Sequence, residues 1–356
     1  MRCRWKASTS LWFASAVIGG SLLAACGDSS APVRPPTQGD STGTDTNHTS
    51  VTFSAENLGV LPGHRQSFAF GINAAGDVAG YSETSSGATH PVLWIAGAAT
   101  DLGVPFGPSG VAYDVNDART VVGYSGDTLD TRGVVWKGGS FTLILAQTPR
   151  QQVIAYGLNN ANEVVGTFIG ITGLARAFRY TSARGLTNIH PSGGYVASKA
   201  FAISDQGTVV GEVTLASGET HAAMWSAVNS FTDLGTLGGL AGTAFGVNAS
   251  GAVVGESEDA TRQVVPFVWR AATGLRALAP AGSARDISDL GRIVGYESGA
   301  VLAATRLSAS VVVLPLLPNS TTSKAFAVNR CGSIAGTANI LNGTSRAVRW
   351  VISRCD

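Results

Sequence analysis

Two carboxylates stand where this sequence otherwise places small residues. A phrase of the form Ala-aromatic-x-Ile/Val-Asn recurs along the chain, and x is Gly or Ala in five copies but Asp114 and Asp286 in the other two. A carboxylate in a tight place must be hydrogen-bonded, or its pKa rises. Such groups are typical of ligand or acid–base sites. Asp114 and Asp286 are therefore candidate site residues, and hydrogen bonding to backbone N–H groups is the alternative explanation.

A second set of candidates lies in or beside the loops around the repeated phrase. We expect these side chains either to contact a ligand or to be solvated loop residues: His64, Arg65, His90 and His221. None of the histidines has the partner spacing of a metal site, and no GxSxG, HExxH, P-loop or EF-hand motif is present. The sequence thus predicts no metal, no cofactor and no catalytic residue, which favours a protein that is not an enzyme.

The phrase belongs to a repeat of 40 to 45 residues that occurs seven times, and we call the copies units 1 to 7. Each unit contains extended stretches a, b, c and, except in unit 7, d. In stretch a, alternation places Ala69 and Gly71 on one face and Phe70 and Ile72 on the other. A turn follows, usually with Gly at its fourth place, although Arg119 departs from this pattern. The copies begin at Ala69, Ala112, Ala155, Ala200, Ala244, Ala284 and Ala325.

Four short strands in a repeat of this length predict one blade of a β-propeller. Unit 7 ends after its c stretch, Arg346–Val351, and an unpartnered d-like stretch, Val51–Pro62, precedes unit 1. We therefore predict an all-β fold over residues 51–356, a seven-bladed β-propeller in which the N-terminal strand completes the last blade. Such pairing would close the ring, so that no unpaired strand edge between units is left for another chain to join. We therefore expect a monomer.

The cysteines indicate one disulfide. Cys331 lies in the a–b turn of unit 7, and Cys355 follows the c stretch of the same unit. Because b and c are antiparallel, these two positions meet at one end of the blade. A disulfide between Cys331 and Cys355 is predicted, since an exported protein meets an oxidising compartment.

The N-terminus predicts export. Residues 1–25 carry three cations followed by an apolar stretch, which is the layout of a signal peptide. The ending Leu23-Ala24-Ala25-Cys26 resembles the lipobox of bacterial lipoproteins, which implies a lipid on Cys26. Residues 26–50 then form a flexible tether rich in Ser, Thr and Gly. We expect anchoring to a membrane through Cys26 in the bacterial cell envelope, at the outer membrane or cell surface.

Charge argues against binding to nucleic acid. The full chain has 24 Lys and Arg against 23 Asp and Glu, and loss of residues 1–25 removes three of the cations. A nucleic-acid-binding protein requires a basic surplus. We expect no nucleic-acid partner.

The repeat resembles the bacterial extracellular HAF-repeat family. That family carries phrases like A-F-x-I-N-x-x-G-x-V-V-G, H-A-F-x-W and D-L-G-x-L-G-G. The best copies here are His221–Trp225 and Asp233–Gly239, and the resemblance covers residues 51–351. It implies export and no established activity. We expect a surface-anchored, non-catalytic protein that binds a protein or a glycan through its loops. The alternatives are an extracellular hydrolase or lyase that uses the two Asp, and a purely structural envelope protein.

Overall fold

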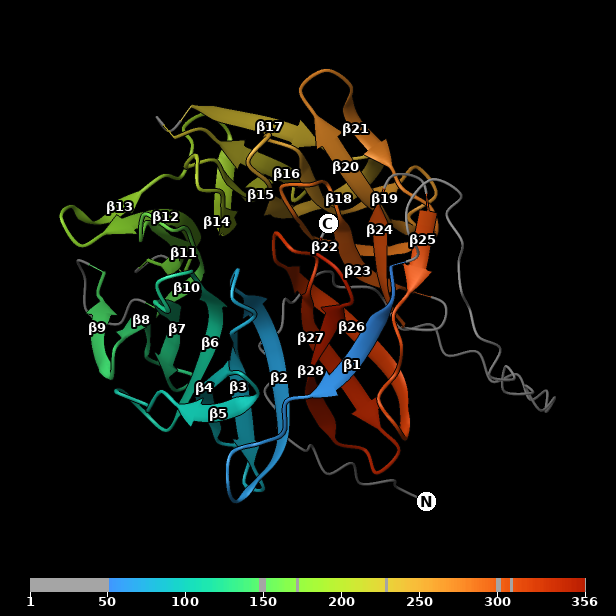
Figure 1. The fold of residues 1–356 in the computed structure, drawn as a ribbon. Helices are drawn as coiled ribbons and strands as arrows, with labels where there is room; N and C mark the ends of the chain where they lie inside the picture. Colours follow the sequence, from blue (N-terminus) through green and yellow to red (C-terminus); the bar gives the residue numbers. More distant parts are fainter. Residues whose placement is uncertain are drawn as a thin grey trace, which may run out of the picture.

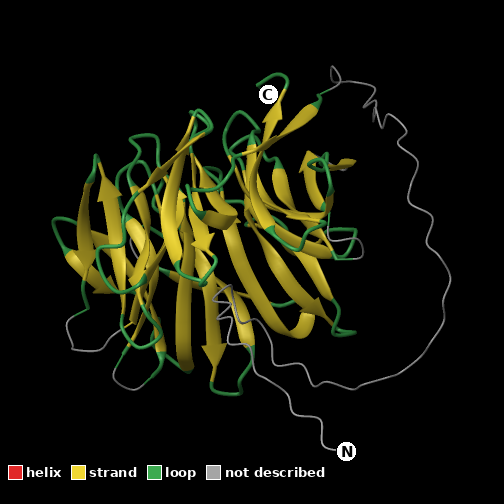
Figure 2. Ribbon diagram, turned by 90° about the horizontal axis from the view of Figure 1, so that it is seen from below, coloured by secondary structure: helices red, strands yellow, loops and turns green. Residues whose placement is uncertain are grey.

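The computed structural model describes residues 51–146, 152–170, 173–227, 230–298, 302–307 and 310–355. The predicted signal peptide (1–25), Cys26 and the tether (26–50) lie outside these ranges. Every regular element in the described ranges is a β-strand, as Figure 2 shows. Within the same ranges, no helix has the length and apolar character needed to cross a membrane.

The strands follow the units. The first strand precedes unit 1, and units 1 to 6 then contribute four strands each, whereas unit 7 contributes three. The strands are β1 (Phe53–Asn57); β2 (His64–Ile72), β3 (Val78–Thr84), β4 (Thr89–Ile95) and β5 (Ala98–Asp101) in unit 1; β6 (Ser109–Val115), β7 (Val121–Gly126), β8 (Thr131–Lys137) and β9 (Ser140–Ile144) in unit 2; β10 (Gln152–Leu158), β11 (Val164–Ile169), β12 (Ala175–Thr181) and β13 (Gly185–Asn188) in unit 3; β14 (Tyr195–Ile203), β15 (Val209–Leu215), β16 (Thr220–Trp225) and β17 (Phe231–Gly235) in unit 4; β18 (Gly238–Val247), β19 (Val253–Asp259), β20 (Val264–Arg270) and β21 (Gly274–Ala277) in unit 5; β22 (Gly282–Ile287), β23 (Ile293–Glu297), β24 (Ala303–Leu307) and β25 (Ser310–Val313) in unit 6; and β26 (Ser320–Val328), β27 (Ile334–Ile340) and β28 (Ser345–Ile352) in unit 7.

Each unit is an antiparallel sheet in the order a-b-c-d, and the sheets have a propeller-like arrangement around a common centre (Figure 1). Units 4 and 5 share one eight-stranded sheet because β16 and β18 meet in a parallel bridge between Thr220 and Ala241. Strands a lie innermost. We call the side with the b–c turns and d–a connections the loop face, and the side with the a–b and c–d turns the turn face.

The predicted pairing between the two ends of the described chain is confirmed. β1 runs antiparallel to β28, with Phe53 opposite Ile352 and Asn57 opposite Val348, and so takes the place of a fourth strand in unit 7. Figure 1 shows β1 alongside β28. Arg349 reinforces this junction, since it donates hydrogen bonds to the Glu56 carboxylate at 2.7 and 2.9 Å and to the Gly76 carbonyl of unit 1 at 2.8 Å.

The core lies between neighbouring sheets. The described residues form seven apolar clusters, and each cluster draws its members from two units. One cluster combines Trp94 of unit 1 with Ala335 and Ala347 of unit 7. Trp94 and the corresponding Trp225 and Trp350 are at most 1% exposed. Burial of both faces of each sheet explains the low content of charged residues.

The a–b turns share one conformation, including the turn that departs in sequence. The fourth turn residue has a positive φ in all seven units, at +82° for Gly76, +60° for Asn162 and +55° for Arg119. A left-handed residue at this place favours Gly or Asn. Arg119 adopts it too, and its guanidinium donates to the Asp77 carboxylate of unit 1 at 2.8 Å. The turn geometry therefore holds even where the side chain disfavours it.

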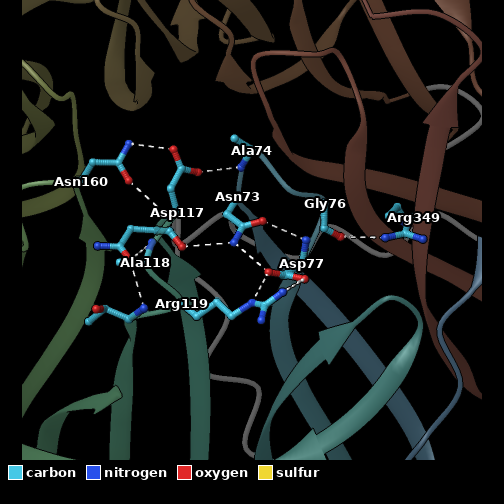
Figure 3. Close-up of polar contacts among 11 residues, drawn as sticks. Asn73, Ala74, Gly76, Asp77, Asp117, Ala118, Arg119, Asn160 and Arg349 are labelled. Atoms are coloured by element: carbon cyan, nitrogen blue, oxygen red, sulfur yellow. Dashed lines mark hydrogen bonds and ion pairs between the residues drawn. The ribbon is translucent and has the colours of Figure 1, made fainter. Parts of the chain in front are cut away.

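The residue that ends strand a links each unit to the next. The Asn73 side-chain oxygen accepts the Asp77 N–H of its own turn at 2.9 Å, while its amide nitrogen donates to the Asn116 carbonyl of unit 2 at 3.2 Å (Figure 3). The other asparagines at this position repeat the contact to the following unit, and Asn329 of unit 7 donates to the Asn73 carbonyl of unit 1 at 3.0 Å. We call this set of contacts the asparagine ladder. The further links are Asn116 to Asn159, Asn159 to Ser204 and Asn248 to Ser288, at 3.1 to 3.2 Å.

Units 4 and 6 lack the side-chain amide that donates to the next unit. Ser204 and Ser288 replace Asn in units 4 and 6, and their hydroxyl oxygens still accept a backbone N–H of their own turn. A serine hydroxyl is too short to reach the next unit as well. In units 2, 3, 4 and 6 the next residue adds a second link, because its side chain accepts a backbone N–H of the unit before, as Asp117 does with the Ala74 N–H at 2.8 Å (Figure 3).

The predicted disulfide is present. Cys331 and Cys355 are bonded, with their Cα atoms 4.5 Å apart. Cys331 lies in the turn between β26 and β27, and Cys355 follows β28. The bond therefore ties the C-terminal end of the described chain to the turn face of unit 7, beside the strand that pairs with β1.

We expect the ladder amide to contribute to stability. Asn248→Ser keeps the acceptor for its own turn but loses the donor to Ser288, and should lower the free energy of unfolding by about 1 kcal/mol. Asn248→Asp places a carboxylate oxygen against the Ser288 carbonyl and should cost more, about 2 kcal/mol or above. Chemical denaturation at neutral pH measures both.

Asn342→Ser is the matched control, because Asn342 makes hydrogen bonds only within an exposed loop-face turn. If the Asn248→Asp variant unfolds at the same denaturant concentration as the wild-type protein, the asparagine ladder does not contribute to stability as proposed.

Reduction of the disulfide should destabilise the protein. The bond joins residues 24 apart in sequence, for which the chain-entropy model gives about 3 kcal/mol. We expect a reductant to lower the unfolding midpoint of the wild-type protein and to leave that of the Cys331→Ser/Cys355→Ser variant unchanged. Equal midpoints of the wild-type protein with and without reductant would contradict this role.

Candidate functional site

A β-bulge in every strand a turns one side chain toward the common centre. The register shifts between Ala69 and Gly71 in unit 1, and at the same place in the six other units. Simple alternation, which places Ala69 and Ile72 on opposite faces, is therefore wrong. These two residues share one apolar cluster, because a bulge inserts an extra residue and shifts the side-chain pattern. The extra residue is Phe70.

The seven bulge residues form a collar around the centre. Phe70 contacts Tyr113 on one side and Phe326 on the other, with ring centroids 5.4 and 5.5 Å apart. The remaining aromatic contacts continue from unit to unit at centroid separations of 5.1 to 5.8 Å. The collar residues are Phe70, Tyr113, Tyr156, Phe201, Phe245, Arg285 and Phe326.

Arg285 is the one collar member that is not aromatic. Its guanidinium carbon lies 3.9 Å from the centre of the Phe245 ring and 5.7 Å from that of Phe326, so it takes the place of a ring between its neighbours. Cation–π contacts of this kind hold a guanidinium over an aromatic face. Our sequence reasoning missed this residue, although a signal was available: Arg occupies a place where the six other units have Phe or Tyr.

Asp114 and Asp286 lie beside the collar, and each links two units. Asp114 accepts the N–H of Val115 at 2.8 Å and that of Leu158, in unit 3, at 3.0 Å. Asp286 accepts the N–H of Ile287 at 2.8 Å and that of Val328, in unit 7, at 2.9 Å. Both oxygens of each carboxylate therefore have backbone partners, as the alternative explanation anticipated.

The environment of both carboxylates disfavours their charge. Burial is the largest effect and raises the pKa of Asp114 to about 7 and that of Asp286 to about 6, although the backbone N–H groups act in the opposite direction. The charge of Asp286 also raises the pKa of Asp114, so the two carboxyl groups lie within electrostatic reach.

Glycines of the preceding units make room for these two side chains. A Cβ added to Gly71 would lie 2.9 Å from a carboxylate oxygen of Asp114, and one added to Gly246 would meet Asp286 at the same distance. The aspartates thus depend on a small residue at the equivalent position of the unit before them.

His90 and His221 lie at the loop face in units 1 and 4. His90 Nδ1 is 2.9 Å from the Asp101 carboxylate, and His221 Nδ1 is 2.9 Å from that of Asp233. These contacts are equivalent, since each joins strand c to strand d within one unit. The histidine of the H-A-F-x-W-like phrase therefore contacts the aspartate of the D-L-G phrase, and this contact joins strands c and d of the unit.

His64 lies against His90 in unit 1, with ring centroids 5.0 Å apart. Its Nδ1 atom is buried without a hydrogen-bond partner. Arg65 is exposed, and its carbonyl accepts a hydrogen bond from Arg346 at 2.8 Å. Ligand binding by these residues, and by Asp114 and Asp286, stays a prediction. The described residues contain no group of three or more His, Cys, Asp or Glu placed to hold a metal ion.

Comparison with known proteins bears on the fold alone. No family model and no curated protein matches the sequence. Among solved structures, a puromycin-hydrolyzing peptidase of Mycobacterium tuberculosis is similar, with a TM-score of 0.56, 12% identity, and coverage of 80% of this chain and 50% of that one. A puromycin hydrolase gives a TM-score of 0.56, 14% identity, and coverage of 81% and 52%. The chain therefore spans about half the length of these proteins, and the similarity supports a propeller-like fold.

The raised pKa values predict a pH dependence of stability. Because the folded state holds the two protons more tightly than the unfolded chain, their contribution is full below about pH 4 and is lost as the pH rises through about 6 to 7. The loss amounts to about 1.4 kcal/mol for each unit of difference between folded and unfolded pKa. Unfolding free energies measured from pH 4 to pH 8 test this.

The comparison protein is Asp114→Ala/Asp286→Ala, since Ala occupies the same position in units 4 and 7. Its stability should fall less steeply between pH 4 and pH 7. If the curves of the variant and the wild-type protein run parallel, the carboxyl groups do not titrate as described.

Proposed function

We propose that this chain is a closed seven-bladed β-propeller that recognises another protein through its loop face, as a non-catalytic, lipid-anchored protein of the bacterial cell envelope. Closure of the ring of units is supported by three sets of contacts between neighbouring units. These are the seven apolar clusters, the seven collar contacts and the link from Asn329 back to Asn73. Membership in the HAF-repeat family is part of the proposal and rests on the repeated motifs. Anchoring at Cys26 rests on the lipobox-like ending.

The observation that carries the binding role is the distribution of exposed apolar side chains. Loop-face turns, connections and strand ends expose Leu129 and Leu341 at 81% and 71%, and seven more large apolar residues to a smaller extent. The turn face, in contrast, is occupied by the asparagine ladder, and two large apolar residues are exposed in or beside its turns, Leu290 and Phe141. Apolar patches, rather than single exposed side chains, mark protein interaction sites, and the proposal is that these loop-face residues form such a patch together. The seven further loop-face residues are Leu145, Leu174, Val196, Leu240, Val264, Val313 and Leu316.

The same geometry gives less support to a hydrolase or lyase. Such an enzyme would need convergent titratable groups that are free to reach a substrate. Asp114 and Asp286 each have both oxygens committed to backbone N–H groups of two units. A binding role needs no such freedom, because a rigid frame can present loops of any sequence.

We expect charge on the loop face to abolish partner capture. The full chain carrying Leu129→Asp and Leu341→Asp should lose its cross-linked partner in envelope membranes, because both changes place a carboxylate in an apolar contact. The control is Leu290→Asp on the turn face, where the wild-type side chain is 55% exposed.

The readout is the set of cross-linked products, compared across the wild-type protein and both variants. A partner that is lost with the loop-face variant and kept with the control supports the proposal. A partner retained by both variants, or lost only with Leu290→Asp, rejects the loop face as the docking surface.

A further inference from the structure

Two cations that form no ion pair with any described residue lie on strands a of neighbouring units, Arg285 on β22 and Lys324 on β26. The Arg285 guanidinium makes no hydrogen bond or ion pair to any described residue, and its contacts are the rings of Phe245 and Phe326. The Lys324 ammonium lies 4.6 Å from the centre of the Tyr296 ring. Burial, and then the charge of Arg285, lower the pKa of Lys324, so the two cations act on each other. Arg285 contacts the ring of Phe326, which lies two residues from Lys324 on β26, and two positive charges on one side of the collar attract an anion.

Unit 4 shows how the repeat neutralises a lysine at the same position. Lys199 corresponds to Lys324, and its ammonium lies 2.7 Å from the Glu212 carboxylate on the facing strand. In unit 7 the facing residue is Thr337, which carries no charge. Lys324 therefore lacks, within the described part of unit 7, the partner that Lys199 has.

Further hydrogen-bonding groups near the collar have no hydrogen-bond partner among the described residues. The carboxylate of Glu256, which raises the pKa of Lys324, makes no hydrogen bond or ion pair among the described residues. On the other side, Tyr81 and Tyr124 pack behind the collar residues Phe70 and Tyr113. Burial raises the pKa of both tyrosines, which keeps their hydroxyls neutral. No described residue forms a hydrogen bond with either hydroxyl.

These groups lie on the loop-face side of the collar. Lys324 precedes the bulge of its strand, and Glu256, Tyr81 and Tyr124 occupy equivalent places just after the Gly of strand b. Each of these residues is partly exposed. Beside the collar rings, this side of the molecule therefore carries two cations, one carboxylate and neutral hydroxyls, which come from units 1, 2, 5, 6 and 7.

We propose that the loop-face side of the central collar binds a sugar acid, with its carboxylate on Arg285 and Lys324 and its hydroxyls on Glu256 and the tyrosines. The planar guanidinium is already oriented by stacking, and its paired N–H groups match a carboxylate. Glu256 disfavours inorganic phosphate, because its carboxylate repels the second negative charge of a phosphate dianion. A hydroxyl of the sugar acid can instead donate a hydrogen bond to Glu256. This site is separate from the apolar loop-face contacts and does not depend on them.

The test is calorimetric titration of the purified full chain with glucuronate, glucose and inorganic phosphate. We expect glucuronate to bind more tightly than the other two. Arg285→Phe, which restores the residue type of the six other units, should weaken glucuronate binding about tenfold to a hundredfold. Lys324→Thr, which copies unit 5 at this position, should weaken it about tenfold.

Lys199→Thr is the matched control and should leave the affinity unchanged, and thermal unfolding checks that each variant folds. Equal binding of glucose and glucuronate, or unchanged affinity in Arg285→Phe, would overturn the proposal. Phosphate binding as tight as that of glucuronate would replace the sugar acid with a simple anion. Because these probes are small molecules, a negative result leaves the proposed protein contact unaffected, and the cross-linking result is equally independent of this site.

Discussion

The side-chain amide at the end of strand a makes two kinds of contact at once. Its oxygen satisfies the backbone of its own turn, and its nitrogen donates to the carbonyl of the following unit, as Asn73 and Asn329 illustrate. A carboxylate lacks the donor, and a hydroxyl lacks the reach. At the five boundaries where this residue is Asn, one side chain therefore links its own turn to the next sheet. The apolar clusters between sheets require a matching orientation of neighbouring sheets, because bulky residues such as Trp94 must meet small ones such as Ala335 across each boundary.

The bulge converts this repeated frame into a site. It directs one side chain per unit toward the centre, where seven such side chains meet, and six of them pack as aromatic rings. Chemistry at the centre is consequently determined by the units that break the pattern. Arg285 places a cation among the rings, and its neighbour Asp286 uses its carboxylate to link units 6 and 7. These exceptions are held by the neighbouring units, since Asp286 accepts the Val328 N–H and needs the space left by Gly246.

The sequence was sufficient for the strands, the unit boundaries, the pairing of β1 with β28 and the Cys331–Cys355 bond, because each follows from a spacing that recurs or from an end that lacks its partner. It was not sufficient for the collar. Alternation assumes a regular strand, and the bulge at Phe70 is a property of the pairing between two strands. The role of His90 and His221 also escaped the sequence reasoning, since their partners Asp101 and Asp233 become neighbours only when strands c and d pair.

The proposed ring depends most directly on β1, whose backbone must be as well protected as the strands that follow it in sequence. Hydrogen exchange of the native full chain, read by mass spectrometry, measures this protection for residues 53–57 and for their partners 348–352. If β1 is an integral strand of unit 7, both segments exchange only in the global unfolding reaction and respond alike to denaturant. Rapid exchange of residues 53–57, while residues 348–352 stay protected, would mean that β1 opens independently and would contradict the closed ring.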